Sequence, residues 1–281
     1  MPMSLTEQMF YCATRVTAYD GGKLIGTGTG FFYRVILDDP QKEIPMLITN
    51  KHVIEGADRI GIAFNLANEA HSGPSGEIVS GRIQFRDEVV IKHPDPAVDL
   101  CAILIGEGLE WAGRTGKAPF YYPIDKRLIP TYEQVSKLDA IERITMIGCP
   151  NGLFDHANNL PIARSGYMAS DITKPFQGRN EFMVDIACFP GSSGSPIFVY
   201  DPNGGFERGS SDYHLKTKFY FVGVLFEGPT IDLDGEVQLS KVKTFSISSM
   251  MHLGLAIPSI ECLVFDAWVG EAQRKGLVII K

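Results

Sequence analysis

Apolar and polar residues alternate in short runs along most of the chain, and turn-forming residues separate the runs. A period of two residues is typical of β-strands that bury one face. The pattern predicts strands over residues 11–19, 26–37, 46–54, 59–65, 76–85, 88–92, 100–105, 143–147, 162–170, 181–187, 197–200, 218–225 and, with a less regular pattern, 231–240. The chain is therefore expected to be mainly β.

Helical spacing is rare by comparison. Residues 130–139 are compatible with one short helical turn, and residues 258–269 predict a helix with Ser259 as its N-cap, since a serine side chain accepts a hydrogen bond from the first helical turn. Apolar residues follow in that segment with helical periodicity, at Ile260, Leu263, Val264 and Trp268. Residues 107–124 mix Gly and aromatic residues without a clean period, which indicates a connector.

Many short strands, few helices and a connector halfway along the chain favour an all-β fold of two antiparallel β-barrels with a C-terminal helix. We expect the N-terminal barrel to span residues 8–118 and a connector to span 119–140. The C-terminal barrel is expected over 141–258, and the helix and tail over 259–281.

Composition narrows the classes of partner. The 281 residues include 26 basic and 33 acidic residues, a net charge of −7 without a basic stripe, so a nucleic-acid partner is not expected. No run of 18 apolar residues occurs, and the N-terminus lacks a basic segment followed by an apolar one. We therefore expect no signal peptide, no membrane partner and a cytoplasmic location.

The five cysteines are odd in number, show no C-x-x-C spacing and lie mostly in apolar surroundings. This pattern suits reduced thiols in the core better than a disulfide framework or a zinc site. No H-E-x-x-H motif is present. We expect neither a metal ion nor another cofactor.

Residues 189–196, Phe-Pro-Gly-Ser-Ser-Gly-Ser-Pro, connect two strand-like runs. Such a loop is often a simple turn, but its glycines also leave backbone N–H groups free to stabilise an oxyanion. Ser193 at its centre is a candidate nucleophile, and a serine hydroxyl needs a base to take its proton. Among six histidines, only His52 follows a buried-looking strand directly. Asp99, the one charge at the start of an apolar run, is the candidate carboxylate that would orient the imidazole.

The order His52, Asp99, Ser193 and the residues around them resemble the chymotrypsin-like serine peptidases. Three segments resemble the bacterial branch of this family: Thr49–Val53, Asp99–Ile103 and Gly191–Pro196. Further segments are similar to the high-temperature-requirement (Deg-type) proteases, at Ile147–Gly152, Ser165–Ser170 and Leu253–Ser259, and the run Asp185–Phe198 also looks like the glutamyl endopeptidases. The resemblance extends from about residue 28 to residue 259.

This resemblance implies a fold of two six-stranded barrels with the active site between them. It implies a serine endopeptidase with a catalytic triad of His52, Asp99 and Ser193, an acyl-enzyme intermediate, and an oxyanion hole from the backbone of Gly191 and Ser193. It also places the primary specificity pocket at Ala187, Cys188 and Phe189, opposite Leu225, Phe226, Glu227 and Gly228. Since Ala187 is not acidic and Leu225 is not histidine, we expect cleavage after small or medium apolar residues of a protein or peptide.

Two departures from the secreted digestive enzymes concern regulation. Ser192 stands where those enzymes have an aspartate that pairs with a new N-terminus, and no activation sequence is present. We therefore do not expect activation by that ion pair, and any regulation is expected to come from loops, homo-oligomerisation or a partner. Because a cytosolic protease without an obvious brake must be selective or latent, our hypothesis is a latent enzyme. Two alternatives remain at this stage: a catalytically silent double-barrel binding module, and an esterase or acyl transferase that uses the same serine.

Overall fold

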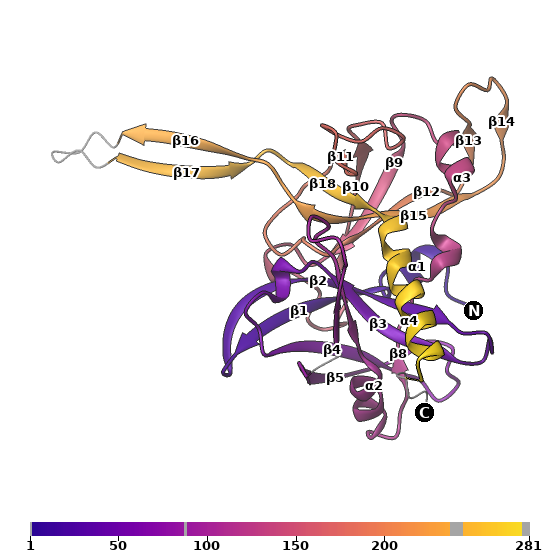
Figure 1. The fold of residues 1–281 in the computed structure, drawn as a ribbon, viewed down its shortest axis with the longest axis vertical. Helices are drawn as coiled ribbons and strands as arrows, with labels where there is room; N and C mark the ends of the chain where they lie inside the picture. Colours follow the sequence, from indigo (N-terminus) through magenta and orange to yellow (C-terminus); the bar gives the residue numbers. More distant parts are fainter. Residues whose placement is uncertain (1, 87–88, 237–243, 277–281) are drawn as a thin grey trace.

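Two β-rich units, one above the other in Figure 1, make up the body of the molecule. The computed structural model describes residues 2–86, 89–236 and 244–276. The lower unit contains the N-terminal strands, and the upper unit contains the strands from residue 143 onward. This arrangement confirms the prediction of a mainly β chain with two successive groups of strands.

The N-terminal unit is one antiparallel sheet. Its strands are β1 Ala13–Asp20, β2 Lys23–Ile36, β3 Glu43–Thr49, β4 Arg59–Ala67, β5 Pro74–Gln84, β6 Val90–Lys92, β7 Cys101–Leu104 and β8 Pro119–Phe120. They pair in the order β5-β4-β1-β2-β3-β7-β6, and β8 pairs with β4. The expected closed barrel of six strands is not confirmed here, because β5 and β6 form the two ends of a sheet of eight described strands.

The C-terminal unit is a closed barrel of six strands, as expected. They are β9 Arg143–Gly148, β10 Ile162–Met168, β11 Phe182–Asp185, β12 Pro196–Asp201, β15 Lys218–Glu227 and β18 Leu253–Pro258. The barrel order is β10-β11-β18-β15-β12-β9. Alternating burial along β11 places Phe182 and Val184 inside the barrel, where Ala256 of β18 belongs to the same buried cluster.

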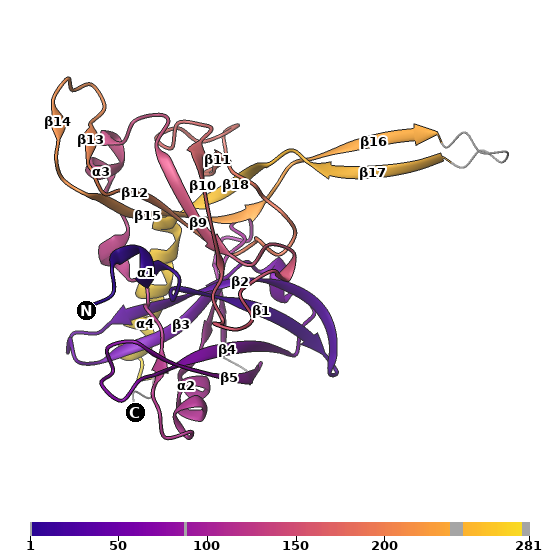
Figure 2. The same cartoon turned by 180° about the vertical axis from the view of Figure 1, so that it is seen from behind.

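Two hairpins extend from this barrel (Figures 1 and 2). One pairs β13 Gly205–Phe206 with β14 Tyr213–His214. The other pairs β16 Thr230–Glu236 with β17 Thr244–Met250 and projects far from the body. The expected strand over 231–240 is found as far as Glu236, and its remaining residues lie outside the described ranges.

The helices are short. They are α1 Leu5–Met9, α2 Gly106–Gly113, α3 Tyr132–Lys137 and α4 Leu263–Arg274, with 3₁₀ turns η1 His52–Ile54, η2 Lys126–Leu128, η3 Pro150–Gly152 and η4 Ser259–Cys262. The predicted N-cap at Ser259 is wrong: the chain leaves β18 through η4, Cys262 precedes α4, and the Ser259 side chain is buried. Within the described ranges, each helix falls short of the length and apolarity that a membrane crossing requires.

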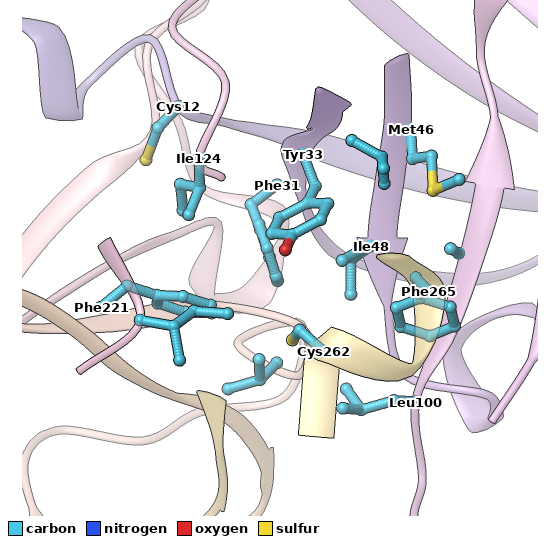
Figure 3. Close-up of a cluster of buried hydrophobic side chains, with 14 of the residues drawn as sticks. Cys12, Phe31, Tyr33, Met46, Ile48, Leu100, Ile124, Phe221, Cys262 and Phe265 are labelled. Carbon is cyan, nitrogen blue, oxygen red and sulfur yellow. The ribbon is translucent and has the colours of Figure 1, made fainter. Parts of the chain in front are cut away.

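A shared hydrophobic cluster holds the two units together (Figure 3). Phe31 of β2, Phe221 of β15 and Phe265 of α4 belong to it, so strands of both units pack on the C-terminal helix. The Tyr33 hydroxyl adds a polar tie, because it donates a 2.6 Å hydrogen bond to Asp266 of α4. Burial of large aromatic residues at this junction fixes the relative position of the loops on either side of it.

All five cysteines are buried and free, which confirms the prediction of reduced core thiols. Burial raises the pKa of the Cys188 thiol to about 11 and that of Cys101 and Cys149 to about 12. Thiols held in the neutral form are poor nucleophiles and poor metal ligands. The cysteines therefore serve packing.

Candidate active site

His52 and Asp99 come from neighbouring strands and lie in contact. β3 ends at Thr49, and His52 begins the turn η1 rather than the end of a strand as predicted. Asp99 lies two residues before β7, which pairs with β3. The His52 Nδ1 and Asp99 Oδ2 atoms are 2.5 Å apart, and the His52 backbone N–H donates to Asp99 Oδ1 at 3.2 Å. The carboxylate therefore fixes both the ring and the backbone of His52.

Asp99 is held as a carboxylate. Burial raises the pKa of its side chain, but hydrogen bonds from His52 and from the backbone N–H of Lys51 outweigh burial, so the pKa lies below its ordinary value. The Asn50 side chain donates to the Asp99 backbone carbonyl at 2.7 Å and holds the segment in place. Sequence reasoning did not identify this role of Asn50.

The lowered pKa of Asp99 predicts a specific acid sensitivity. A carboxyl group with a lower pKa in the folded than in the unfolded state contributes stability above its unfolded pKa, and this contribution is lost as the pH falls through the folded pKa. The difference in unfolding free energy between wild type and Asp99→Asn is therefore expected to shrink below about pH 4. Urea unfolding of both proteins at successive pH values measures it, and a constant difference would contradict the prediction.

Ser193 lies in the loop between β11 and β12. Gly191 and Gly194 on either side of it have φ angles of +84° and +87°, which favour glycine, so the loop bends sharply around Ser193. The half-buried Ser193 hydroxyl donates to the Phe226 carbonyl at 3.2 Å. Among the described residues it makes no hydrogen bond to His52.

Backbone contacts connect this loop to the strand that precedes His52. The Thr29 N–H of β2 donates to the Ser193 carbonyl at 2.9 Å. The Thr49 hydroxyl at the end of β3 in turn donates to the Thr29 carbonyl at 2.7 Å. Ser193 of the C-terminal unit is thus connected to the His52 segment by two hydrogen bonds in series.

Gly194 is where this packing tolerates no side chain. A Cβ at Gly194 would lie 1.9 Å from the Thr29 carbonyl oxygen, whereas a Cβ at Gly116, with a similar φ of +86°, would meet nothing within 4 Å. We expect Gly194→Ala to lower the unfolding free energy by about 3 kcal/mol or more and Gly116→Ala by only about 1 kcal/mol. Equal losses in urea unfolding would contradict the collision.

Two backbone N–H groups of the loop are available for an oxyanion. Within the described residues, the N–H groups of Gly191 and Ser193 donate no hydrogen bond, while that of Ser192 between them donates to Phe189. The Gly191 carbonyl accepts a hydrogen bond from the Thr29 hydroxyl at 2.9 Å. This contact orients the peptide unit between Gly191 and Ser192. This arrangement suits stabilisation of negative charge beside the Ser193 hydroxyl.

Arg164 of β10 supports the loop from the barrel side, and sequence reasoning missed it. Its guanidinium donates to the Ser192 hydroxyl at 3.0 Å and to the Ala187 carbonyl. Burial lowers the pKa of Arg164, and within the described residues no carboxylate forms an ion pair with it. The Ser192 hydroxyl also accepts from the Phe189 N–H at 3.3 Å. A cation from the barrel wall thus holds the residue next to Ser193.

Arg164→Met is expected to separate activity from stability. Methionine fills similar space without the hydrogen bonds to Ser192 and Ala187, and removing an unpaired half-buried charge has little cost for folding. We expect kcat to fall by about tenfold or more, because the oxyanion N–H groups lose their support, with little change in the melting temperature. Arg143→Met on the exposed side of β9 is the matched control. A large drop in melting temperature would contradict a positioning role.

The residues expected to line a specificity pocket differ in exposure. Cys188 and Leu225 are buried in the barrel core. Ala187, Phe189, Phe226 and Gly228 are half-buried, and Glu227 is exposed. The Phe189 ring lies edge-on to the His252 ring, with centroids 5.4 Å apart. Apart from Glu227, none of the residues expected to line the pocket has a charged side chain.

A cavity of about 620 Å³ opens beside His52 and Asp99 on the N-terminal unit. Its lining residues are Lys51, His52, Ile54, Glu55, Gly56, Ala57, Phe85, Arg86, Val90, Lys92 and Asp99. Since His52 is 45% exposed, its imidazole is accessible from this side. The cavity has the size of a site that accommodates a few residues of a peptide or a small molecule.

A family model described as trypsin-like peptidase domain matches residues 28–204, which include His52, Asp99 and Ser193. The chain belongs to the trypsin-like peptidases. The protein is accordingly a trypsin-like serine protease, a hydrolase that acts on protein or peptide. Comparison with curated protein sequences gave no match.

Solved structures of proteases align with this trypsin-like peptidase over most of its length. A serine endoprotease from Yersinia pestis is 15% identical, with a TM-score of 0.47, over 99% of this chain and 68% of that one. A thermostable serine protease from an extremophilic microorganism is 13% identical, with a TM-score of 0.46, over 92% and 97%. The tobacco etch virus protease bound to product is 12% identical, with a TM-score of 0.44, over 82% and 72%.

Proposed function

We propose that the protein is a serine endopeptidase in which Ser193 is the nucleophile, His52 the general base and Asp99 the residue that orients His52. The observation that carries the proposal is the 2.5 Å contact between His52 Nδ1 and Asp99 Oδ2. It leaves Nε2 of an accessible imidazole as the acceptor of a proton, which is the arrangement that activates a serine.

In the proposed reaction, the Ser193 oxygen attacks the carbonyl carbon of the scissile peptide bond, and its proton moves to His52 Nε2. The N–H groups of Gly191 and Ser193 stabilise the oxyanion that forms. The tetrahedral intermediate then breaks its C–N bond, and His52 returns the proton to the leaving amine. A water molecule hydrolyses the acyl-enzyme by the same steps, with His52 again as the base.

We propose that the enzyme is latent until its Ser193 hydroxyl turns toward His52. The hydrogen bond from Ser193 to the Phe226 carbonyl supports this proposal, because the proton is then directed away from the base. An oligomeric or partner protein that contacts the loop would favour the active rotamer. Rapid digestion of casein by the purified protein alone would contradict latency.

The end of β15 is the proposed binding edge for an extended substrate. The register between β15 and β18 shifts between Leu225 and Glu227, which leaves Phe226 without a partner in that ladder. Its carbonyl, and the backbone of Glu227 and Gly228, could pair with a substrate strand. With uncharged residues at Ala187, Cys188 and Phe189, cleavage after a small or medium apolar residue, as in Deg-type enzymes, is proposed.

The alternative is a double-barrel module that binds peptides without cleaving them. The Ser193–Phe226 hydrogen bond also fits this reading. A set of fluorogenic peptides that differ only at the residue before the cleaved bond tests both proposals, with Ser193→Ala as control. Cleavage after Ala or Val that is lost in Ser193→Ala supports the peptidase; binding without cleavage under all conditions supports the module.

We also propose that the peptidase works in the cytosol, because its five reduced thiols suit that setting.

A further inference from the structure

A second cavity, of about 610 Å³, lies on the face of the sheet formed by β1, β4 and β5. It is lined by Thr14, Arg15, Thr17, Tyr19, Gly61, Ile62, Ala63, Ser80, Gly81, Arg82, Trp111, Phe154 and Asn159. None of these residues takes part in the proposed reaction. The volume is in the range of pockets that bind small molecules.

The strand register explains the shape of this cavity. Thr17, Gly61 and Arg82 are paired across the three strands, and Ala63 pairs with Ser80 in the next row. A Cβ at Gly61 would lie 2.5 Å from the Thr17 hydroxyl and 3.1 Å from the Tyr19 ring, so glycine lets these β1 side chains lie close over β4 at the base of the cavity. The longer side chains on β1 and β5 therefore stand around this base as walls.

The cavity is positively charged although the chain has a net charge of −7. Its lining residues include two arginines, Arg15 and Arg82, and no aspartate or glutamate. Within the described part of the chain, neither arginine forms an ion pair with a carboxylate. The Nε atom of Arg15 is buried without a hydrogen-bond partner. Because a buried N–H without a partner is costly, Arg15 suits a ligand that brings negative charge, and the exposed Arg82 adds a second cation to attract it.

Aromatic rings complete the walls. The Arg15 guanidinium lies 5.6 Å from the centroid of the Phe154 ring, and that of Arg82 lies 4.9 Å from the centroid of Tyr19. These contacts hold the cations in place while leaving N–H groups to bind a ligand. Trp111 of α2 lines the cavity at the edge strand β5, where it packs on Gly81 on the face opposite to the Arg82 side chain, and 40% of its surface is exposed. It offers an open indole surface on which a flat ring can stack.

We propose that this cavity binds a small anion that carries a flat aromatic ring, an aromatic carboxylate or a nucleoside phosphate. Arg15 and Arg82 bind its charged group, and Trp111 packs against its ring. Bidentate hydrogen bonding by guanidinium groups suits both carboxylate and phosphate oxygens.

The cavity is connected to the loop that carries Ser193, and this step rests on the proposed function. Phe154 lies in the segment between η3 and β10, and a Cβ at Gly152, the last residue of η3, would lie 3.5 Å from Arg15 Nε. The neighbouring Asn151 N–H donates to the Pro190 carbonyl at 2.5 Å. A ligand on Arg15 therefore acts on the segment that holds Pro190, the residue before the oxyanion loop's Gly191, and changes the reactivity of Ser193.

Titration of the full chain with Ser193→Ala, monitored by tryptophan fluorescence and calorimetry, tests the site without reference to catalysis. Adenosine 5′-monophosphate and N-acetyl-phenylalanine are the two probes, because they distinguish the two sources of negative charge. Adenosine, which lacks the charge, and inorganic phosphate, which lacks the ring, are their controls. We expect at least one probe to bind and change the emission of Trp111, since Trp268 packs against the hydrophobic core.

Variants locate the binding. Arg82→Gln, at an exposed position, and Arg15→Gln are each expected to weaken the affinity for the probe by about tenfold. Arg143→Gln, outside the cavity, is expected to have no effect. Arg82→Gln keeps the test valid if Arg15→Gln does not fold. Absence of binding by both probes at about 1 mM, or binding that survives Arg82→Gln and Trp111→Leu unchanged, would overturn the proposal.

The connection to the active site has its own readout. Wild-type protein is labelled with a fluorophosphonate with and without saturating probe, and the rate of labelling at Ser193 is expected to change by at least about threefold. An unchanged rate, with binding established by calorimetry, would overturn the coupling. Absence of labelling in both conditions would instead argue against the proposed nucleophile, so the two failures are distinguishable.

Discussion

His52→Ala is expected to lower kcat/KM for a cleaved peptide by about 10⁶-fold. Without the imidazole, no group in contact with Asp99 can take the proton of Ser193, and a neutral serine hydroxyl is a weak nucleophile. Because His52 is 45% exposed, the smaller side chain is not expected to unfold the protein. Steady-state cleavage of a fluorogenic peptide measures the loss, and the melting temperature checks the fold.

The matched control is His214→Ala, at an exposed position in β14. It should leave activity unchanged, which separates the loss of the base from the loss of any histidine. Activity in His52→Ala within about a hundredfold of wild type would exclude His52 as the general base.

Asp99→Asn is expected to lower kcat by about 10⁴-fold with little change in KM. An asparagine has nearly the same shape, but its amide can present a donor to His52 Nδ1 and so favour the tautomer whose Nε2 carries the proton. That tautomer cannot accept a proton from Ser193. Peptide cleavage under saturating substrate measures kcat directly.

Asp212→Asn, at an exposed position in the loop before β14, controls for the change of charge alone and should leave kcat unchanged. A higher KM with an unchanged kcat in Asp99→Asn would mean that Asp99 contributes to substrate binding rather than to the orientation of His52.

Sequence alone predicted the β class, the C-terminal helix and the contact between His52 and Asp99. The signals were local: alternation along the strands, and polar residues at the ends of apolar runs. The helix start at Ser259 was placed wrongly because a capping residue cannot reveal that a 3₁₀ turn precedes the helix. The short helix α2 was missed because its glycines weaken the helical pattern.

The contacts that shape the Ser193 loop were not predictable in this way. Thr29 comes from β2 and Arg164 from β10, and neither has a pattern around it that indicates a role at Ser193. Thr29 reaches the loop only because the two units pack through the cluster of Phe31, Phe221 and Phe265, whereas Arg164 reaches it from within the C-terminal barrel. Such partners depend on strand register and on the junction between units, which no local pattern determines.

The proposed triad is tested most directly by the site of labelling with a fluorophosphonate, determined by mass spectrometry on wild type, Ser193→Ala and His52→Ala. We predict modification of Ser193 in wild type, slowly if the enzyme is latent, and no modification in either variant. Modification of another serine, or an unmodified Ser193 in folded wild type after prolonged exposure, would contradict the proposal that Ser193 is a nucleophile activated by His52.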